Sequence, residues 1–160
     1  MLAEALASLE GSALAASLRG STWLYPLVNA GHILGIALLF GAIAPLDLRL
    51  IGVWKEIPLG SLSRVLVPVA ATGLGLAATA GSLLFITKAT EYAASEFFQA
   101  KMLMLALGIT NALAFHALGR RRDGASAHAV APMPLQRLQG ATSLTVWLTV
   151  IVLGRLVGYF

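Results

Sequence analysis

The fold is decided by one stretch of sequence, WLYPLVNAGHILGIALLFGAIAPLDLRLIG, at residues 23–52. Residues 24–46 contain no Asp, Glu, Lys or Arg, and an apolar run of this length is long enough to cross a bilayer as a helix. His32 lies inside this run with Asn29 one turn before it, and the run ends at Asp47 and Arg49. Polar and charged groups in a membrane are costly without partners, so these four side chains predict either a functional site or specific packing.

The composition of the chain is that of an integral membrane protein. Of its 160 residues, 58% are hydrophobic and 11% are charged, and the mean hydropathy is +0.84. Soluble domains contain about 45–50% apolar and about 25% charged residues. The absence of cysteine excludes disulfides and thiolate metal sites. A net charge of +4 would suggest nucleic acid as the partner of a soluble protein, but here the basic residues are expected to orient the chain in a lipid bilayer, and no nucleic-acid partner is predicted.

Four apolar segments, at about residues 24–46, 65–86, 97–118 and 141–160, are predicted to span the membrane. Joined by three connections, they predict a single all-α domain over residues 1–160, an integral membrane four-helix up-down bundle. Leucines at helical spacing in residues 1–18 predict a short N-terminal amphipathic helix at the membrane surface. The second segment is rich in small residues, which favours close helix packing or a homo-oligomer. Thr72 and Thr79 in it are expected to bond to carbonyls of their own helix.

The distribution of Lys and Arg predicts the orientation of the spans. The connections after the first and third spans carry seven of these residues: Arg49, Lys55, Arg64, Arg120, Arg121, Arg122 and Arg137. The opposite side carries three: Arg19, Lys88 and Lys101. Because cytoplasmic connections are enriched in Lys and Arg, both termini are predicted to lie outside the cytoplasm.

Three cationic or potentially cationic side chains are predicted to share the outer half of the membrane. From the rise of 1.5 Å per residue, His32 lies about 12 Å, Arg155 about 8 Å and Lys101 about 6 Å from the outer edge. The spans offer no carboxylate at that depth, so the trio predicts a cofactor-binding site for an anionic guest, with the His32 imidazole as the metal ligand. The alternatives are a hydrogen-bonded core histidine at His32, and Lys101 and Arg155 reaching to the interface as anchors.

A second polar set lies toward the cytoplasmic end. Asp47, Arg49, Asn111 and His116 are predicted to form a structural polar cluster that fixes the ends of the first and third spans. His32 and His116 differ in depth by about 15 Å, so they are not expected to be the two axial ligands of one haem.

Several motifs together resemble a known family. They are W-x-Y-P from Trp23, H-x-L-G-I-A-L-L-F-G from His32, D-L-R-L-x-G from Asp47, K-M-x-x-L from Lys101, G-x-x-N-A-x-x-F-H from Gly108, and G-R-x-x-x-Y from Gly154. The chain resembles a family of short bacterial four-span membrane proteins known only as a domain of unknown function. This resemblance implies the fold and a multi-pass location in the bacterial inner membrane.

A more distant resemblance rests on a histidine in an early helix and a Lys-Met pair opening a later one, here His32 and Lys101. It is to the copper-resistance D family and to the HemJ type of protoporphyrinogen oxidase, which are four-helix membrane proteins. In the latter, an intramembrane His and a Lys are implicated in haem and porphyrin handling. By this analogy, His32 and Lys101 would handle a haem or porphyrin.

Two functions of different classes follow from these residues. The first is binding of haem b or a porphyrin for electron transfer, with His32 as axial ligand, Lys101 and Arg155 paired with propionates, and a redox partner protein. The second is a non-enzymatic membrane subunit or a copper- or metal-handling accessory, in which His32 only holds helices together. The sequence lacks H-E-x-x-H, a P-loop and G-x-S-x-G, so no catalytic residue is predicted and enzymatic activity is left open.

Overall fold

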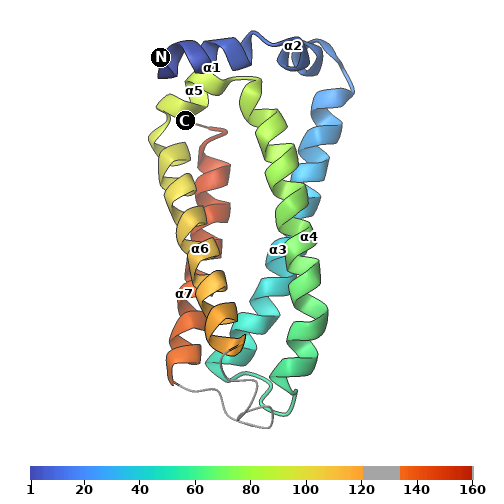
Figure 1. Cartoon of the computed structure of the whole chain (residues 1–160). Coiled ribbons are helices and arrows are strands. Elements are labelled where there is room, and N and C mark those ends of the chain that lie inside the picture. The colour runs from blue at the N-terminus through green and yellow to red at the C-terminus, as the bar shows by residue number, and fades with distance from the viewer. Residues whose placement is uncertain (121–133, 160) are drawn as a thin grey trace.

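The computed structural model describes residues 1–120 and 134–159 of the chain (Figure 1). Within these residues all regular secondary structure is helical, which confirms the predicted all-α class. The helices are α1 (Leu2–Glu10), α2 (Ala13–Gly20), α3 (Leu24–Ile51), α4 (Leu59–Ile86), α5 (Ala89–Ala94), α6 (Glu96–Arg120) and α7 (Pro134–Leu156). Residues 121–133, which include Arg121 and Arg122 of the predicted cytoplasmic connection, lie outside the described part.

Three helices are long and apolar enough to cross a membrane: α3, α4, and α6 over Glu96–Phe115. Their number indicates a multi-pass membrane protein. α3 and α4 each have 28 residues, more than the roughly 20 that a bilayer requires. α7, the predicted fourth span, carries Arg137 and Arg155 and is not among the three.

α3 extends beyond the predicted end of the first span at residue 46. It continues past Pro45 through Asp47 and Arg49, and it ends at Gly52, whose φ of 120° favours glycine. Asp47 and Arg49 are buried with partners in neighbouring segments, so these charged residues lie inside the helix and do not terminate it.

The long helices pack as two pairs. α3 packs most extensively on α4, and α6 packs on α7; the pairs meet chiefly through α3 and α7. At one end of the molecule α1, α2 and α5 lie across the helices, and we call this the capped end (Figure 1). At the opposite end, the far end, α3 turns into α4 through residues 52–58. Figure 1 shows the two pairs close together near the far end and apart toward the capped end.

Glycines make the α3–α4 contact a backbone-to-backbone contact. A Cβ at Gly35 would lie 2.5 Å from the Ala77 nitrogen, and a Cβ at Gly73 would lie 2.4 Å from the Leu39 nitrogen. Such distances are too short for any side chain, so glycine is required on both helices. Thr72 Oγ1 and Thr79 Oγ1 donate to the carbonyls of Pro68 and Gly75, 2.9 and 2.8 Å away, which confirms the predicted bonds within that helix.

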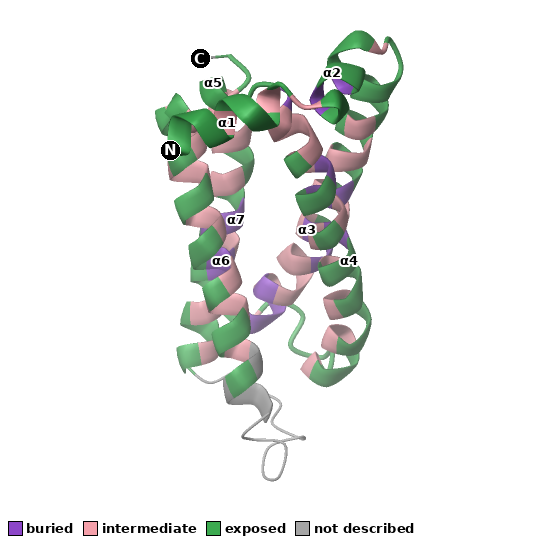
Figure 2. Ribbon diagram, turned by 45° about the horizontal axis from the view of Figure 1, so that its top comes forward, coloured by how far each residue is buried: buried purple, intermediate pink, exposed green. Residues whose placement is uncertain are grey.

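Buried residues are confined to the places where helices meet, and exposed residues cover the outward faces (Figure 2). Half of the buried hydrophobic residues are alanines, as close helix packing in lipid requires. Large apolar side chains on the membrane-spanning helices are exposed, among them Leu27, Val65, Leu103 and Leu113. Apolar surface of this extent is typical of contact with lipid tails.

The single amphipathic helix predicted over residues 1–18 is divided into α1 and α2. The helix is interrupted at Gly11. Ser12 then caps the start of α2, because its Oγ accepts a hydrogen bond from the Ala15 nitrogen at 3.3 Å. Serine at this position satisfies a backbone donor at the start of a helix, so the break is encoded locally. Both helices lie across the capped end.

Candidate functional site

His32 is held by the backbone of the neighbouring helix. Its Nδ1 lies 2.8 Å from the Ala77 carbonyl oxygen on α4. A carbonyl only accepts, so Nδ1 carries the hydrogen and donates it, and Nε2 of the neutral imidazole keeps its lone pair. The half-buried ring lies against Gly81, where a Cβ would come within 3.0 Å of the His32 Cε1.

Histidines that bind a metal make the same kind of hydrogen bond, and so does a histidine that only joins two helices. An Nδ1–H bond to a carbonyl fixes the tautomer and the orientation of the ring and leaves Nε2 as the ligand atom. The described residues contain no group of three or more His, Cys, Asp or Glu side chains that could hold a metal ion together. A metal at His32 would therefore have to bring most of its own ligands, as the iron of a haem does.

Lys101 is the second predicted site residue that the structure brings to this region. It lies on α6, is partly buried, and packs on Gly154 of α7, where its Nζ is 3.6 Å from the position that a Cβ at Gly154 would occupy. Its charge acts electrostatically on His32. The pair thus joins a neutral nitrogen ligand and a cation from the two helix pairs.

Arg155, the third member of the predicted trio, lies on another face of α7. It follows Gly154 directly, and successive residues of a helix point about 100° apart. Its side chain is exposed, with the guanidinium carbon 4.4 Å from the centre of the Tyr159 ring, and Nη2 donates to the Tyr159 hydroxyl. The structure therefore places Lys101 within electrostatic range of His32 and gives Arg155 a separate partner, Tyr159.

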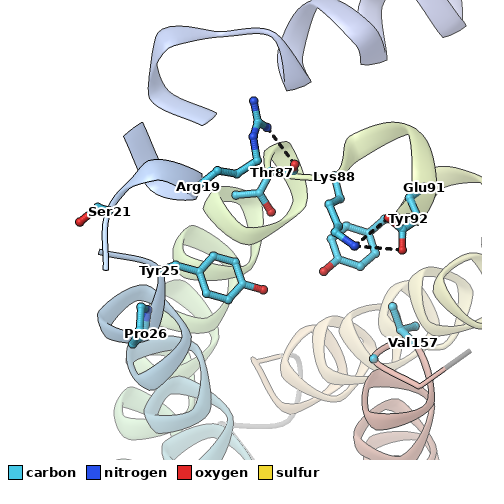
Figure 3. A pocket seen from close by; sticks show the side chains of 10 residues that line it. Arg19, Ser21, Tyr25, Pro26, Thr87, Lys88, Glu91, Tyr92 and Val157 are labelled. Atoms are coloured by element: carbon cyan, nitrogen blue, oxygen red, sulfur yellow. Dashed lines mark hydrogen bonds and ion pairs between the residues drawn. The ribbon is translucent and has the colours of Figure 1, made fainter. Parts of the chain in front are cut away.

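A cavity of about 580 Å³ lies at the capped end (Figure 3). It is lined by Arg19, Ser21, Tyr25, Pro26, Thr87, Lys88, Glu91, Tyr92, Val157 and Gly158. Tyr25 lies two turns before His32 on α3, and Gly158 lies one turn beyond Gly154, so the cavity is on the capped side of the His32–Lys101 level. Its volume is within the range of about 300–1,000 Å³ that small-molecule sites occupy.

The charged and hydroxyl groups of the cavity favour an anion. Arg19 and Lys88 contribute two cations against the single carboxylate of Glu91. Lys88 Nζ lies 2.9 Å from Glu91 Oε2, and this partner raises the pKa of Lys88. Burial raises the pKa of Tyr92, so its phenol stays neutral and can donate a hydrogen bond. The tyrosine hydroxyls of Tyr25 and Tyr92 are directed into the space between them (Figure 3).

α1 and α2 are held over this cavity by two residues. Arg19 Nη1 donates to the Thr87 carbonyl and Nη2 donates to the Glu10 carbonyl, and both distances are 2.9 Å. Glu10 Oε2 accepts from the Thr90 nitrogen at 3.1 Å and from the Thr90 hydroxyl at 2.6 Å, and these bonds lower the pKa of Glu10. The N-terminal helices are thus tied to the segment that joins α4 to α5 and to α5 itself.

The residues predicted to form a polar cluster have separate partners. Asp47 accepts a hydrogen bond from Ser143 on α7. Arg49, 2% exposed, donates from Nε to the Ile57 carbonyl at 2.7 Å and from Nη2 to the Lys55 carbonyl at 3.0 Å. Asn111 Nδ2 donates to the Gln139 carbonyl at 3.1 Å, which ties α6 to α7. The side chain of His116 lies outside the described part of the structure.

Sequence reasoning did not identify the partners that complete these sites. For His32 they are the Ala77 carbonyl and Gly81, and for Asp47 they are on α7. The spacing of four residues between Gly73, Ala77 and Gly81 was a usable signal, because small residues one turn apart mark the face on which another helix packs. The Asp47 partner, Ser143, had no comparable signal.

Comparisons with known proteins do not assign the chain to a family. No protein-family model matches the chain, no curated protein matches it, and no solved structure matches it.

Proposed function

We propose that this chain is a protein of the bacterial inner membrane that binds haem b or a related porphyrin near its capped end and uses it in electron transfer. The observation that carries the proposal is the fixed tautomer of His32: Nδ1 donates to the Ala77 carbonyl and Nε2 is left as a ligand atom. The family resemblance of the sequence motifs supports the membrane location and remains part of the proposal.

The membrane architecture that goes with this function is a four-helix up-down bundle. α7 has 23 residues, enough to cross a bilayer, and it packs on both α6 and α3. We propose that it is the fourth span. The excess of Lys and Arg in the connections of the far end then assigns that end to the cytoplasm, and the capped end with both termini to the outside.

The groups that would hold the guest lie in the half of the molecule that ends at the capped end. His32 would supply an axial ligand, and Lys101 would pair with a propionate, because a buried anion requires a cationic partner. Arg19 and Lys88 line the cavity, whereas Arg155 does not. They offer two further cations to the anionic edge of the guest. When bound, the iron of a haem would supply one-electron chemistry, and a redox partner protein would be required.

The visible spectrum of the purified protein tests this proposal. We expect a Soret band and an α-band in the reduced-minus-oxidised spectrum, either as purified or after haem is added. The chain has three histidines, so His32→Ala has two matched controls, His116→Ala and His128→Ala. The bands should disappear in His32→Ala and persist in both controls. Their absence from the haem-supplemented wild type, or their persistence in His32→Ala, would contradict the proposal.

A second function rests on the same hydrogen bond. Because His32 joins α3 to the backbone of α4, it would also serve a non-enzymatic membrane subunit in which the imidazole stabilises the helix pair. In that case His32→Ala lowers the melting temperature but leaves the metal and chromophore content of the purified protein unchanged. A copper-handling role predicts copper binding that His32→Ala abolishes.

A further inference from the structure

A buried carboxyl group lies where the two helix pairs join at the far end. Asp47 on α3 is 4% exposed, and its neighbour Ser143 on α7 is 8% exposed. One carboxyl oxygen of Asp47 accepts a hydrogen bond from Ser143, while Oδ2 has no hydrogen-bond partner among the described residues. The helices are very close here, since a Cβ at Gly140 would lie 2.9 Å from the Asp47 carbonyl oxygen. A polar atom of this kind is rarely left unpaired in a native structure.

Among the described residues, no cation pairs with the Asp47 carboxyl group. On α7, the residues that meet α3 here are Gly140 and Ser143, both uncharged. On α3, Arg49 lies two residues beyond Asp47 and donates to the carbonyls of Lys55 and Ile57.

The other described ionisable side chains near the far end are exposed to the surroundings of the protein. Arg64 on α4 and Arg137 on α7 are exposed, as are Lys55 and Glu56 in the connection between α3 and α4. On α6, Asn111 donates to the Gln139 carbonyl, and the side chain of His116 lies outside the described part. Asp47 therefore has one neutral hydroxyl as its described partner.

Solvation decides which form of Asp47 this site accepts. An ionised carboxylate that is taken out of water requires a paired cation or several hydrogen bonds, and a single hydroxyl does not replace them. A metal cation is a poor alternative, because hard cations take about six oxygen ligands. A proton neutralises the carboxylate without further ligands.

We propose that the α3–α7 junction is a proton-binding site in which Asp47 is the acceptor and Ser143 positions the carboxyl group. A hydronium ion from the far side transfers its proton to Oδ2, giving a neutral carboxylic acid and one water molecule. Because α3 and α7 form the main contact between the helix pairs, an ionised Asp47 would weaken this contact, and binding of the proton is thereby linked to closure of the junction.

Isotope-edited infrared spectroscopy tests the proposal on the intact protein. The chain has two aspartates, Asp47 and Asp123, so Asp123→Asn leaves Asp47 as the only aspartate that 13C-aspartate labels. In lipid nanodiscs at about pH 7, where an aspartate in water is ionised, we expect a 13C-shifted band of a protonated carboxylic acid. In D2O this band should move to lower frequency, because deuterium replaces the exchangeable proton of the carboxylic acid.

The remaining outcomes decide against the proposal. A labelled carboxylate band without an acid band shows that Asp47 is ionised and overturns it. An acid band that is replaced by a carboxylate band when sodium is substituted for potassium identifies a sodium site, which also overturns it. Ser143→Ala in the same background should move the acid band, since the Ser143 hydroxyl bonds to this carboxyl group; an unmoved band removes Ser143 from the site. The test does not depend on haem binding, so its outcome is separate from that of the proposed function.

Discussion

Replacing Gly35 with alanine tests how closely the packing of α3 on α4 controls the His32 site. The new Cβ would lie 2.5 Å from the Ala77 nitrogen, 2.8 Å from the Ala77 Cα and 2.9 Å from the Gly73 carbonyl oxygen. All three are backbone atoms of α4, so no rotamer change relieves the overlap. The helices must move apart.

The size of this movement follows from ordinary contact distances. Non-bonded carbon atoms pack at about 3.5–4.0 Å, so the shortest contact requires a separation of about 1 Å. That separation stretches the His32 Nδ1 to Ala77 oxygen distance, now 2.8 Å, beyond hydrogen-bond range. Overpacking costs about 1–3 kcal/mol, and the lost hydrogen bond about 1 kcal/mol. Gly35→Ala should therefore lower the free energy of unfolding by about 2–4 kcal/mol.

Thermal unfolding in detergent measures this effect, and each helix offers a matched control. A Cβ at Gly41 on α3 or at Gly75 on α4 meets nothing within 4 Å. Because alanine is favoured over glycine inside a helix by about 0.5–1 kcal/mol, both control variants should be as stable as the wild type or more stable. Gly73→Ala, whose Cβ would lie 2.4 Å from the Leu39 nitrogen, should behave like Gly35→Ala. The reasoning is refuted if Gly35→Ala unfolds at the temperature of Gly41→Ala or above it.

Two further predictions concern the two ends of the molecule. The bonds from Thr90 lower the pKa of Glu10, so they stabilise the attachment of α1 at pH values above the pKa of an unfolded glutamate; this stabilisation is lost as the pH falls through the lower, folded pKa. Hydrogen exchange in α1 should therefore rise at acidic pH, and Glu10→Gln should raise it already at neutral pH. At the far end, Gly140→Ala would place a Cβ 2.8 Å from the Leu50 Cβ and 2.9 Å from the Asp47 carbonyl oxygen. It should lower the free energy of unfolding by about 1–3 kcal/mol, measured by thermal unfolding.

Each of these predictions has a control. Glu4 is exposed and pairs with the N-terminal ammonium group, so Glu4→Gln should leave hydrogen exchange in α1 at neutral pH as in the wild type and keep its rise at acidic pH. An equal response in the Glu4 and Glu10 variants would show that general charge, and not the Thr90 contact, holds α1. For Gly140 the control is Gly60→Ala, where nothing lies within 4 Å of the new Cβ. Equal melting temperatures for the two glycine variants would contradict the close approach of α3 and α7.

The membrane-spanning helices could be predicted because their signal is carried by consecutive residues. Residues 24–46 contain no Asp, Glu, Lys or Arg, and an uncharged run of that length has few alternatives to a membrane helix. The small residues of α4 likewise predicted close packing, and the contacts of Gly73 and Ala77 follow from them. Both inferences use properties of one segment at a time.

The partners of His32 and Asp47 could not be predicted because they depend on how separate helices align. The acceptor for His32 is a backbone oxygen, Ala77 O, and every residue of α4 has one. Asp47 follows the apolar run, so composition placed it at the membrane edge. The structure continues α3 to Ile51 and packs Ser143 of α7 against it, which buries the carboxyl group. The relative position of α3 and α7 is a tertiary property that no single segment encodes.

The placement of both sites on α3 explains why this helix is packed so closely at two levels. Gly35 brings it against α4 beside His32, and Gly140 of α7 comes against it beside Asp47. His32 and Asp47 are 15 residues apart, or about 22 Å along the helix, too far for strong direct electrostatic coupling. Since the two close contacts involve different partner helices, the imidazole is positioned by one helix pair and the carboxyl group by the junction between the pairs. The proposed cofactor site and the proposed proton site are thus fixed independently on a common rigid element, and any coupling between them must pass through movement of α3 itself.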